Sequence, residues 1–233
     1  VSYKMAPTEF IGYQTLEYEE IIEKIIVEGK EVNKLEGVEE YVSLLFNKTP
    51  FYAEGGGQVG DKGVIENSNF KLEVLNTIKR ADKVIEHYGK LINGNIKTRD
   101  KVKLTVNKNN RNKTTAHHSA THLLHSALRR NLGNHVTQKG SLVSESKLRF
   151  DISHNSAISE ELIIKIEKDI NEQIFRNSSV TSSILNKSEA IKKGAMAIFG
   201  EKYGNEVRVI EMGTSNNNKA FSVELCGGTH VKR

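Results

Sequence analysis

The sequence has few of the features that mark secreted or membrane proteins. It contains a single cysteine, Cys226, which excludes an internal disulfide framework and fits a reducing compartment. No apolar run approaches the roughly 18 residues that a spanning helix needs, and one of the longest covers only residues 162–164. Residues 1–4 are not followed by the apolar segment of a signal peptide. We therefore expect a cytoplasmic protein without a membrane partner.

The charge that is present is unevenly distributed. The chain has 233 residues, enough for one large domain or two small ones, and a formal net charge of +5. Residues 1–40 carry ten acidic and four basic side chains, whereas residues 100–150 carry ten basic ones against Asp100 and Glu145. This asymmetry favours an anionic partner, with RNA the leading candidate, near residues 100–150. The alternative is a solvated, lysine-rich surface.

The first part of the chain has the pattern of a small β-barrel or sandwich. Short strand-like runs are separated by turn residues, with Gly89 and Asn93-Gly94 between them, and Asn-Gly predicts a tight hairpin turn. Residues 16–32 are rich in glutamate and isoleucine and fit either a helix or a strand. The expected strands cover residues 64–65, 71–78, 84–88 and 102–106. We assign residues 1–107 to this domain.

From residue 108 the pattern changes to α+β. The polar run 107–112 interrupts the strands, and a helix capped by Thr114 or Thr115 is predicted to run to Leu132. Ser159 is predicted to open a second helix that ends near Arg176, and a shorter helix is expected over residues 188–199. Expected strands cover residues 140–143, 147–151, 180–185, 206–212 and 220–225. The second domain therefore spans residues 108–233.

Two pairs of potential metal ligands stand far apart in the sequence. His118 and His122 are four residues apart, so they share one face of the predicted helix. Cys226 and His230 have the same spacing across a flexible Gly-Gly-Thr turn. Thiolate and imidazole in two close pairs are typical of tetrahedral zinc sites. His125 also projects near that helix face, whereas two other histidines are better read as satisfied or solvated: His117 and His135.

The spacing of these residues does not decide between a structural and a catalytic role for the site. Four protein ligands usually close a structural zinc site, and a catalytic zinc keeps a position for water. Cys226 could alternatively act as a nucleophile with a histidine base, although the paired spacing favours ligation. A phosphate-binding P-loop at residues 55–57 is excluded, because no Gly-Lys-Ser/Thr follows.

Several segments, in this order, resemble a known family. The segments 49–61, 118–125 and 226–231 are similar to the editing domain of alanyl-tRNA synthetase and to its free-standing AlaX relatives, and two further stretches agree: 135–141 and 194–204. The opening segment 8–13 is similar to the domain within the synthetase rather than to AlaX. We therefore expect an excised fragment that lacks the ATP-binding class II catalytic part and the rest of the synthetase chain.

The resemblance implies an activity, a fold and site residues. It implies hydrolysis of tRNA(Ala) mischarged with serine or glycine, one bound Zn²⁺ per chain, a translation-factor-like β-barrel, and an α+β core like that of threonyl-tRNA synthetase. Thr49 and Gln58 belong to the glycine-rich motif that lines the family's editing pocket, and Gln138 lies in a motif tied to editing. Gly55 departs from a frequent serine. The implied zinc ligands are His118, His122, Cys226 and His230.

Substrate selection follows from elementary chemistry. Serine differs from alanine by one hydroxyl, and a site that hydrogen-bonds this hydroxyl can reject alanine. Thr49 is the candidate for that contact, but the argument does not account for glycine. The acceptor end of tRNA(Ala) is expected against residues 100–150 through salt-sensitive phosphate contacts. The rival interpretations are a non-catalytic, zinc-stabilised tRNA-binding module, a free-standing zinc-dependent aminoacyl-tRNA deacylase, and a zinc hydrolase of small esters or peptides.

Overall fold

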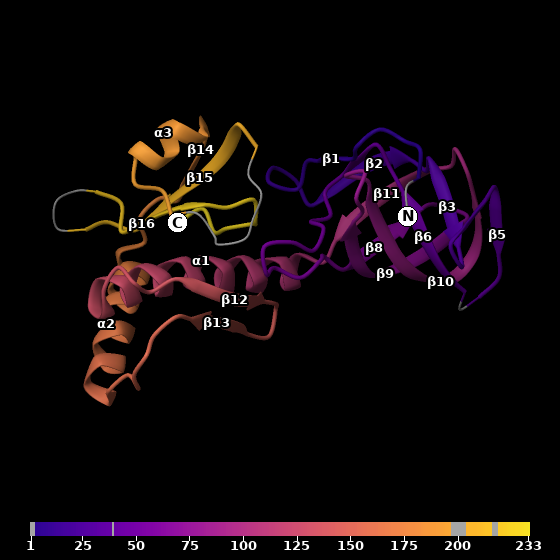
Figure 1. The fold of residues 1–233 in the computed structure, drawn as a ribbon. Helices are drawn as coiled ribbons and strands as arrows, with labels where there is room; N and C mark the ends of the chain where they lie inside the picture. Colours follow the sequence, from indigo (N-terminus) through magenta and orange to yellow (C-terminus); the bar gives the residue numbers. More distant parts are fainter. Residues whose placement is uncertain (1–2, 39, 197–203, 216–218) are drawn as a thin grey trace. The chain divides into compact units, whose positions relative to one another are not determined.

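The structure divides into two compact units. It is a computed structural model that describes residues 3–38, 40–196, 204–215 and 219–233 (Figure 1). The first unit comprises Val1–Gly55 and Val59–Arg111, and the second comprises Gly56–Gln58 and Asn112–Arg233. Each has its own apolar core. Among the described helices, none combines the length and apolar character needed to cross a membrane.

The first unit is built on a nine-stranded sheet whose neighbouring strands are antiparallel. Its order is β2-β11-β8-β9-β10-β6-β3-β4, with β5 beside β10. In β9, Phe70, Leu72 and Val74 are buried and the residues between them are exposed, the alternation that places one face on a core. The strands are β2 Glu17–Ile21, β3 Lys24–Val27, β4 Lys30–Val32, β5 Lys34–Glu36, β6 Tyr41–Leu45, β8 Gly63–Glu66, β9 Phe70–Lys79, β10 Ile85–Lys97 and β11 Lys101–Val106, and the short β1 Glu9–Phe10 and β7 Lys48–Thr49 form a separate parallel pair.

The sequence predicted a small barrel, and the described strand pairing is open. No ladder between described residues joins the two outer strands, β2 and β4, so the strands form a sheet rather than a closed barrel. The ambiguous residues 16–32 form strands β2, β3 and β4. Ile22 and Ile25, both fully buried, belong to the apolar core, which explains why the glutamate-rich composition did not produce a helix.

The Asn-Gly turn prediction is wrong. Asn93 and Gly94 lie inside the 13-residue strand β10, where the pairing with β9 shifts register between Leu91 and Asn93. Gly94 has φ +89°. A Cβ at this position would lie 2.7 Å from Phe70 Cα. Glycine therefore allows the two strands to approach closely where their register shifts. The same Asn-Gly pair is also common in hairpin turns, so the dipeptide alone does not distinguish the two structures.

A buried ion pair fixes the base of the glycine-rich loop in the first unit. The Arg111 guanidinium pairs with the Asp61 carboxylate and donates to the carbonyls of Gly12 (2.7 Å) and Pro50 (2.9 Å). Asp61 Oδ2 also accepts the Tyr52 N–H at 2.7 Å. Because both ionised groups are buried and hydrogen-bonded, loss of one partner would leave an uncompensated charge. The pair therefore anchors both ends of residues 52–61.

The second unit is α+β, as predicted. Among the described residues, a β12–β13 hairpin and three helices accompany the antiparallel sheet β14-β15-β16. In β15, Ile210 and Met212 join the core that α1 and α2 contribute to, whereas Val207 and Val209 pack with Ala190 of α3. The elements are α1 Lys108–Leu132, β12 Gln138–Val143, β13 Leu148–Ile152, α2 Glu160–Arg176, β14 Thr181–Asn186, α3 Lys187–Lys192, β15 Glu206–Met212 and β16 Ser222–Leu225.

Two helix ends differ from the prediction. Helix α1 begins at Lys108 rather than at Thr114 or Thr115, because Asn107 Oδ1 accepts the Asn110 N–H at 3.0 Å and caps the first turn. Helix α3 ends at Lys192. Of the predicted helix over residues 188–199, the last part falls in residues 197–203, which lie outside the described residues. Ser159 caps α2 as predicted.

His87 makes the stability of the first unit depend on pH. It is fully buried, and burial lowers its pKa to about 4. The unfolded chain takes up a proton below about pH 6.5 that the folded unit accepts only near pH 4, so lowering the pH favours unfolding. We expect this group to remove about 3 kcal/mol of stability between those pH values. Denaturant unfolding at pH 7 and pH 4 should show that the free energy of unfolding falls less in His87→Gln than in the wild type. An NMR titration of His87 with a midpoint near pH 6.5 would contradict the lowered pKa.

Candidate metal centre

Four buried or half-buried side chains of the second unit converge as the sequence predicted. His118 and His122 project from one face of α1, with ring centroids 5.2 Å apart. Cys226 follows directly after strand β16, and His230 lies four residues beyond it. One potential ligand atom from each residue lies within 4.8 Å of the others. We call His118, His122, Cys226 and His230 the His3Cys group.

Two separations within the His3Cys group match those around a tetrahedral zinc ion. Cys226 Sγ lies 3.5 Å from His118 Nε2 and 3.3 Å from His230 Nε2. Zinc bonds of about 2.3 Å to sulfur and about 2.0–2.1 Å to nitrogen predict an S···N edge of roughly 3.5 Å in a tetrahedron. His122 Nδ1 is buried without a hydrogen-bond partner. Such an orphaned nitrogen is costly unless another group satisfies it, and a metal ion held by the group would do so.

Gln58 sets the tautomer of His118. Three residues of the glycine-rich loop, 56–58, belong to the second unit, where Val143 donates its N–H to Gly57 O at 2.8 Å. The Thr229 N–H reaches Gln58 Oε1 at 3.0 Å, so this atom is the acceptor oxygen of the amide. His118 Nδ1, 2.7 Å from the same oxygen, must therefore donate. His118 Nε2 is therefore unprotonated, with its lone pair directed toward Cys226. This is the tautomer in which Nε2 can bind a metal ion.

A serine orients His230 in the same manner. His230 Nδ1 lies 3.2 Å from Ser119 Oγ, which also accepts the Val231 N–H at 3.1 Å. The Nε2 atom is the one that faces Cys226. Two of the three imidazoles thus have a hydrogen-bond partner on the nitrogen that points away from Cys226. Partners of this kind hold metal-ligating histidines in place.

The electrostatic environment keeps the imidazoles neutral. Burial lowers the pKa of His118 to about 3, with smaller contributions from His122 and the positive charge of Arg208. Burial also lowers the pKa of His122 and brings that of His230 well below its usual value. Neutral imidazole is the form that binds metal, so the group needs no proton release from its histidines at neutral pH.

Arg208 supports the turn that carries Cys226. Its Nη1 donates to Cys226 O at 3.0 Å and to Gly228 O at 2.8 Å. Gly228 in turn donates its N–H toward Cys226 Sγ at 3.3 Å, an interaction that favours the thiolate. The sequence reasoning missed Arg208. It stands in β15, and only the pairing of β15 with β16 brings it beneath the turn.

Glu224 is a second residue that the sequence reasoning missed. It is buried, with Oε2 3.8 Å from His122 Nε2 and Oε1 3.2 Å from His125 Nδ1. Ser222 Oγ donates to the same Oε1 at 3.2 Å. His125 is therefore not a member of the His3Cys group but a neighbour, which is linked to His122 through the Glu224 carboxylate. The alternation of β16, which places residues 222, 224 and 226 on one face, was the available signal.

The remaining histidines outside the group have other partners. His117 Nδ1 lies 2.7 Å from Ser144 O, and His135 Nε2 lies 3.0 Å from His154 Nδ1 in an exposed pair. These contacts agree with the interpretation of His117 and His135 as satisfied or solvated. Neither contributes an atom to the His3Cys group.

The structure places the other candidate residues in separate surroundings. Thr49 is fully buried in the first unit, where its Oγ1 accepts the Phe51 N–H at 3.1 Å and lies 2.7 Å from His87 Nε2. Because His87 Nδ1 must donate to Leu44 O at 3.0 Å, the Thr49 hydroxyl donates to Nε2. One acceptor lone pair of Thr49 remains. Gln138, half-buried, opens strand β12 in the second unit.

Comparisons with known proteins identify relatives of the chain. The family described as tRNA synthetases class II (A) matches residues 1–110, and the threonyl and alanyl tRNA synthetase second additional domain matches residues 207–233, which include Cys226 and His230. An alanine–tRNA ligase of Mesorhizobium japonicum is 48% identical over 229 residues, which cover 97% of this chain and 26% of the relative. The chain thus spans about a quarter of the length of that relative. It is a homologue of alanine–tRNA ligase, matched to it along nearly its whole sequence.

Proposed function

We propose that this chain removes wrongly attached serine or glycine from tRNA(Ala) by hydrolysing the ester at the 3′ end of the tRNA. The observation that carries the proposal is the convergence of the His3Cys group, two of whose S···N separations match a tetrahedral zinc ion, in a homologue of alanine–tRNA ligase. Under this proposal residues 1–107 form the domain that bears the glycine-rich motif. Residues 108–233 form an editing core related to that of threonyl-tRNA synthetase.

The donor set of the His3Cys group suits zinc. One thiolate and three neutral imidazoles are ligands of borderline softness, which zinc accepts and magnesium or calcium does not. We propose one zinc ion per chain, held by His118, His122, Cys226 and His230. A bound zinc ion supplies Lewis acidity, which can polarise an ester carbonyl, activate water or anchor an amino group.

The chain's own residues have separate roles in this proposal. Gln58 and Ser119 hold His118 and His230 in their ligating orientation. Gln138 is proposed to contact the aminoacyl end. The exposed basic side chains in residues 100–150 would hold the acceptor end through phosphates, with a dependence on salt. Glu224 places a buried carboxylate beside His122 and is the candidate for holding a water or the substrate amino group.

Thr49 is the proposed determinant for serine. Its remaining lone pair can accept the hydroxyl of a seryl group, which alanine lacks. Thr49→Val is expected to reduce the preference for Ser-tRNA(Ala) over Ala-tRNA(Ala) roughly fivefold, since a hydrogen bond of about 1 kcal/mol is lost. The ratio of the two deacylation rates is the measurement, because it is insensitive to a general loss of folded protein. Thr49→Ser should restore the ratio, and an unchanged ratio in Thr49→Val would reduce Thr49 to a buried partner of His87.

A deacylation assay tests the proposed function as a whole. The chain, purified without a histidine tag, is incubated with Ser-tRNA(Ala), Gly-tRNA(Ala), Ala-tRNA(Ala) and a small amino-acid ester, and the metal content is measured in parallel. We expect hydrolysis of the first two tRNAs, little of the third, and about one zinc per chain. Hydrolysis of the small ester alone would instead identify a general zinc hydrolase, and an active protein free of metal would contradict the zinc proposal.

One observation favours a second candidate. Four protein ligands fill a tetrahedral shell, the arrangement found in structural zinc sites. The chain would then be a non-catalytic tRNA-binding module whose zinc stabilises the fold of the second unit. Under this alternative the same assay shows tRNA binding and one zinc per chain without deacylation of any of the three aminoacyl-tRNAs.

A further inference from the structure

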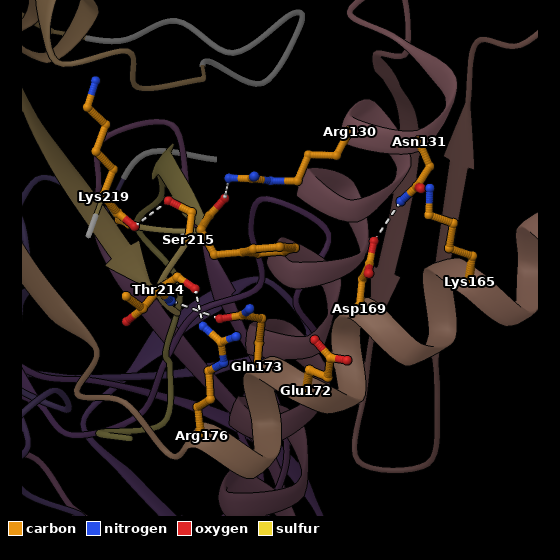
Figure 2. Close-up of a pocket in the computed structure, with 12 residues that line it drawn as sticks. Arg130, Asn131, Lys165, Asp169, Glu172, Gln173, Arg176, Thr214, Ser215 and Lys219 are labelled. Atoms are coloured by element: carbon orange, nitrogen blue, oxygen red, sulfur yellow. Dashed lines mark hydrogen bonds between the residues drawn. The ribbon is translucent and has the colours of Figure 1, made fainter. Parts of the chain in front are cut away.

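A second polar site lies in the second unit. Helices α1 and α2 line a cavity of about 660 Å³ together with residues 214–215 and 219–221 (Figure 2). Its lining, within the described part of the chain, includes no member of the His3Cys group. A cavity of this size can accommodate a phosphate with its sugar.

Positively charged side chains dominate the lining. Arg130, Lys165, Arg176 and Lys219 contribute four positive charges against the two negative charges of Asp169 and Glu172. Asp169 Oδ2 accepts the side-chain amide of Asn131 at 2.8 Å, as Figure 2 shows. Part of the acidic charge is therefore already hydrogen-bonded within the protein. The balance favours an anionic ligand.

The two guanidinium groups are held in place before any ligand binds. Arg130 lies 4.4 Å from the centroid of the Phe221 ring and donates to Phe221 O at 3.2 Å. Arg176 donates to Thr214 O at 2.8 Å. Each guanidinium has five N–H donors in a planar fork that matches phosphate oxygens, so these contacts leave further donors. Fixing them in advance lowers the entropic cost of binding a ligand.

We propose that this cavity binds a backbone phosphate of RNA, and the identification of that RNA as tRNA rests on the proposed function. The cations of the cavity come from α1, α2 and Lys219, so the cavity extends the proposed anion-binding surface beyond residues 100–150. It holds the tRNA and takes no part in ester hydrolysis. Guanidinium forks and lysines recognise the phosphate group, and base identity is not read there.

Helix α2 offers matched variants on either side of the cavity. Lys165 and Glu172 line it, whereas Lys168 and Glu167 are exposed on the same helix and do not. Binding of uncharged tRNA(Ala) is measured at several salt concentrations. Lys165→Gln should weaken it about three- to tenfold and lower the salt slope by about one. Glu172→Gln should strengthen binding, and Lys168→Gln and Glu167→Gln should change it less than about twofold.

The outcomes separate this proposal from its rivals. Equal effects of Lys165→Gln and Lys168→Gln would overturn it, because they would indicate only the general field of the surface. The assignment to RNA would be overturned if inorganic phosphate or a mononucleotide bound in the cavity while Lys165→Gln left tRNA binding unaffected. Uncharged tRNA carries no aminoacyl ester, so its binding is independent of hydrolysis. If the variants follow the expected binding pattern but the chain fails to deacylate Ser-tRNA(Ala), the proposed function is refuted and the cavity proposal stands.

Discussion

Cys226→Ala is expected to abolish zinc binding and to lower Ser-tRNA(Ala) hydrolysis more than about 100-fold, since altering groups that merely orient metal ligands already costs 10–100-fold. Cys226 is the thiolate of the His3Cys group, with Sγ within 3.5 Å of two imidazoles. Its removal leaves the three histidines of the group without their anionic partner. Binding of uncharged tRNA(Ala) should remain within about threefold, because phosphate contacts come from lysine and arginine. Metal analysis, single-turnover deacylation and filter binding measure the three quantities.

A histidine outside the group is the matched control. His135 is exposed and lies beside His154 in the second unit, so His135→Ala removes an imidazole without touching the His3Cys group. It should keep about one zinc per chain and wild-type hydrolysis. Unchanged hydrolysis in Cys226→Ala would sink the zinc-site assignment. Loss of tRNA binding together with hydrolysis would indicate that the metal stabilises the whole unit.

The convergence of the His3Cys group could be predicted because its parts are local. His118 and His122 share a helix face by helical geometry alone, and Cys226 and His230 are joined by a short turn. Only the meeting of the two pairs needed tertiary structure. Gln58 was named from the motif that contains it, but its hydrogen bonds to His118 and Thr229 could not be foreseen. They depend on residues 56–58 packing with the second unit.

The errors have two physical causes. Thr114 or Thr115 was predicted to cap α1, which Asn107 caps instead, and Asn93-Gly94 was assigned to a turn and instead lies within β10. Asparagine and glycine serve caps, irregular strand positions and turns alike, so the residue types do not distinguish them. Glu224 and Arg208 were missed because their neighbours are set by strand pairing. Spacing along the sequence does not reveal the register in which two strands pair, and so does not reveal these contacts.

Gly228→Ala is expected to damage the centre although it alters no ligand. A Cβ at residue 228 would lie 2.5 Å from His118 Nδ1 and 2.9 Å from Gln58 Oε1, and closer still to His118 Cε1. Relief of this overlap requires a shift of about 1 Å in the His118 ring or in the turn, and the His118–Gln58 hydrogen bond would break. We expect a loss of about 10- to 100-fold in zinc affinity. The value of kcat/KM should fall about 100-fold, as misplacement of this size in a reacting site does.

The adjacent glycine provides the control for this prediction. A Cβ at Gly227 meets nothing within 4 Å, so Gly227→Ala should keep zinc affinity and kcat/KM within about twofold of the wild type. The two variants carry the same substitution in the same turn, and they differ in whether the added methyl meets His118. Thermal unfolding of both, with and without a chelator, distinguishes a displaced ligand from a misfolded turn: chelation should lower the Tm of the wild type and of Gly227→Ala equally, and should lower that of Gly228→Ala by a smaller amount. Equal zinc affinity in the two variants would show that the turn can yield, and that close packing against His118 does not hold the centre together.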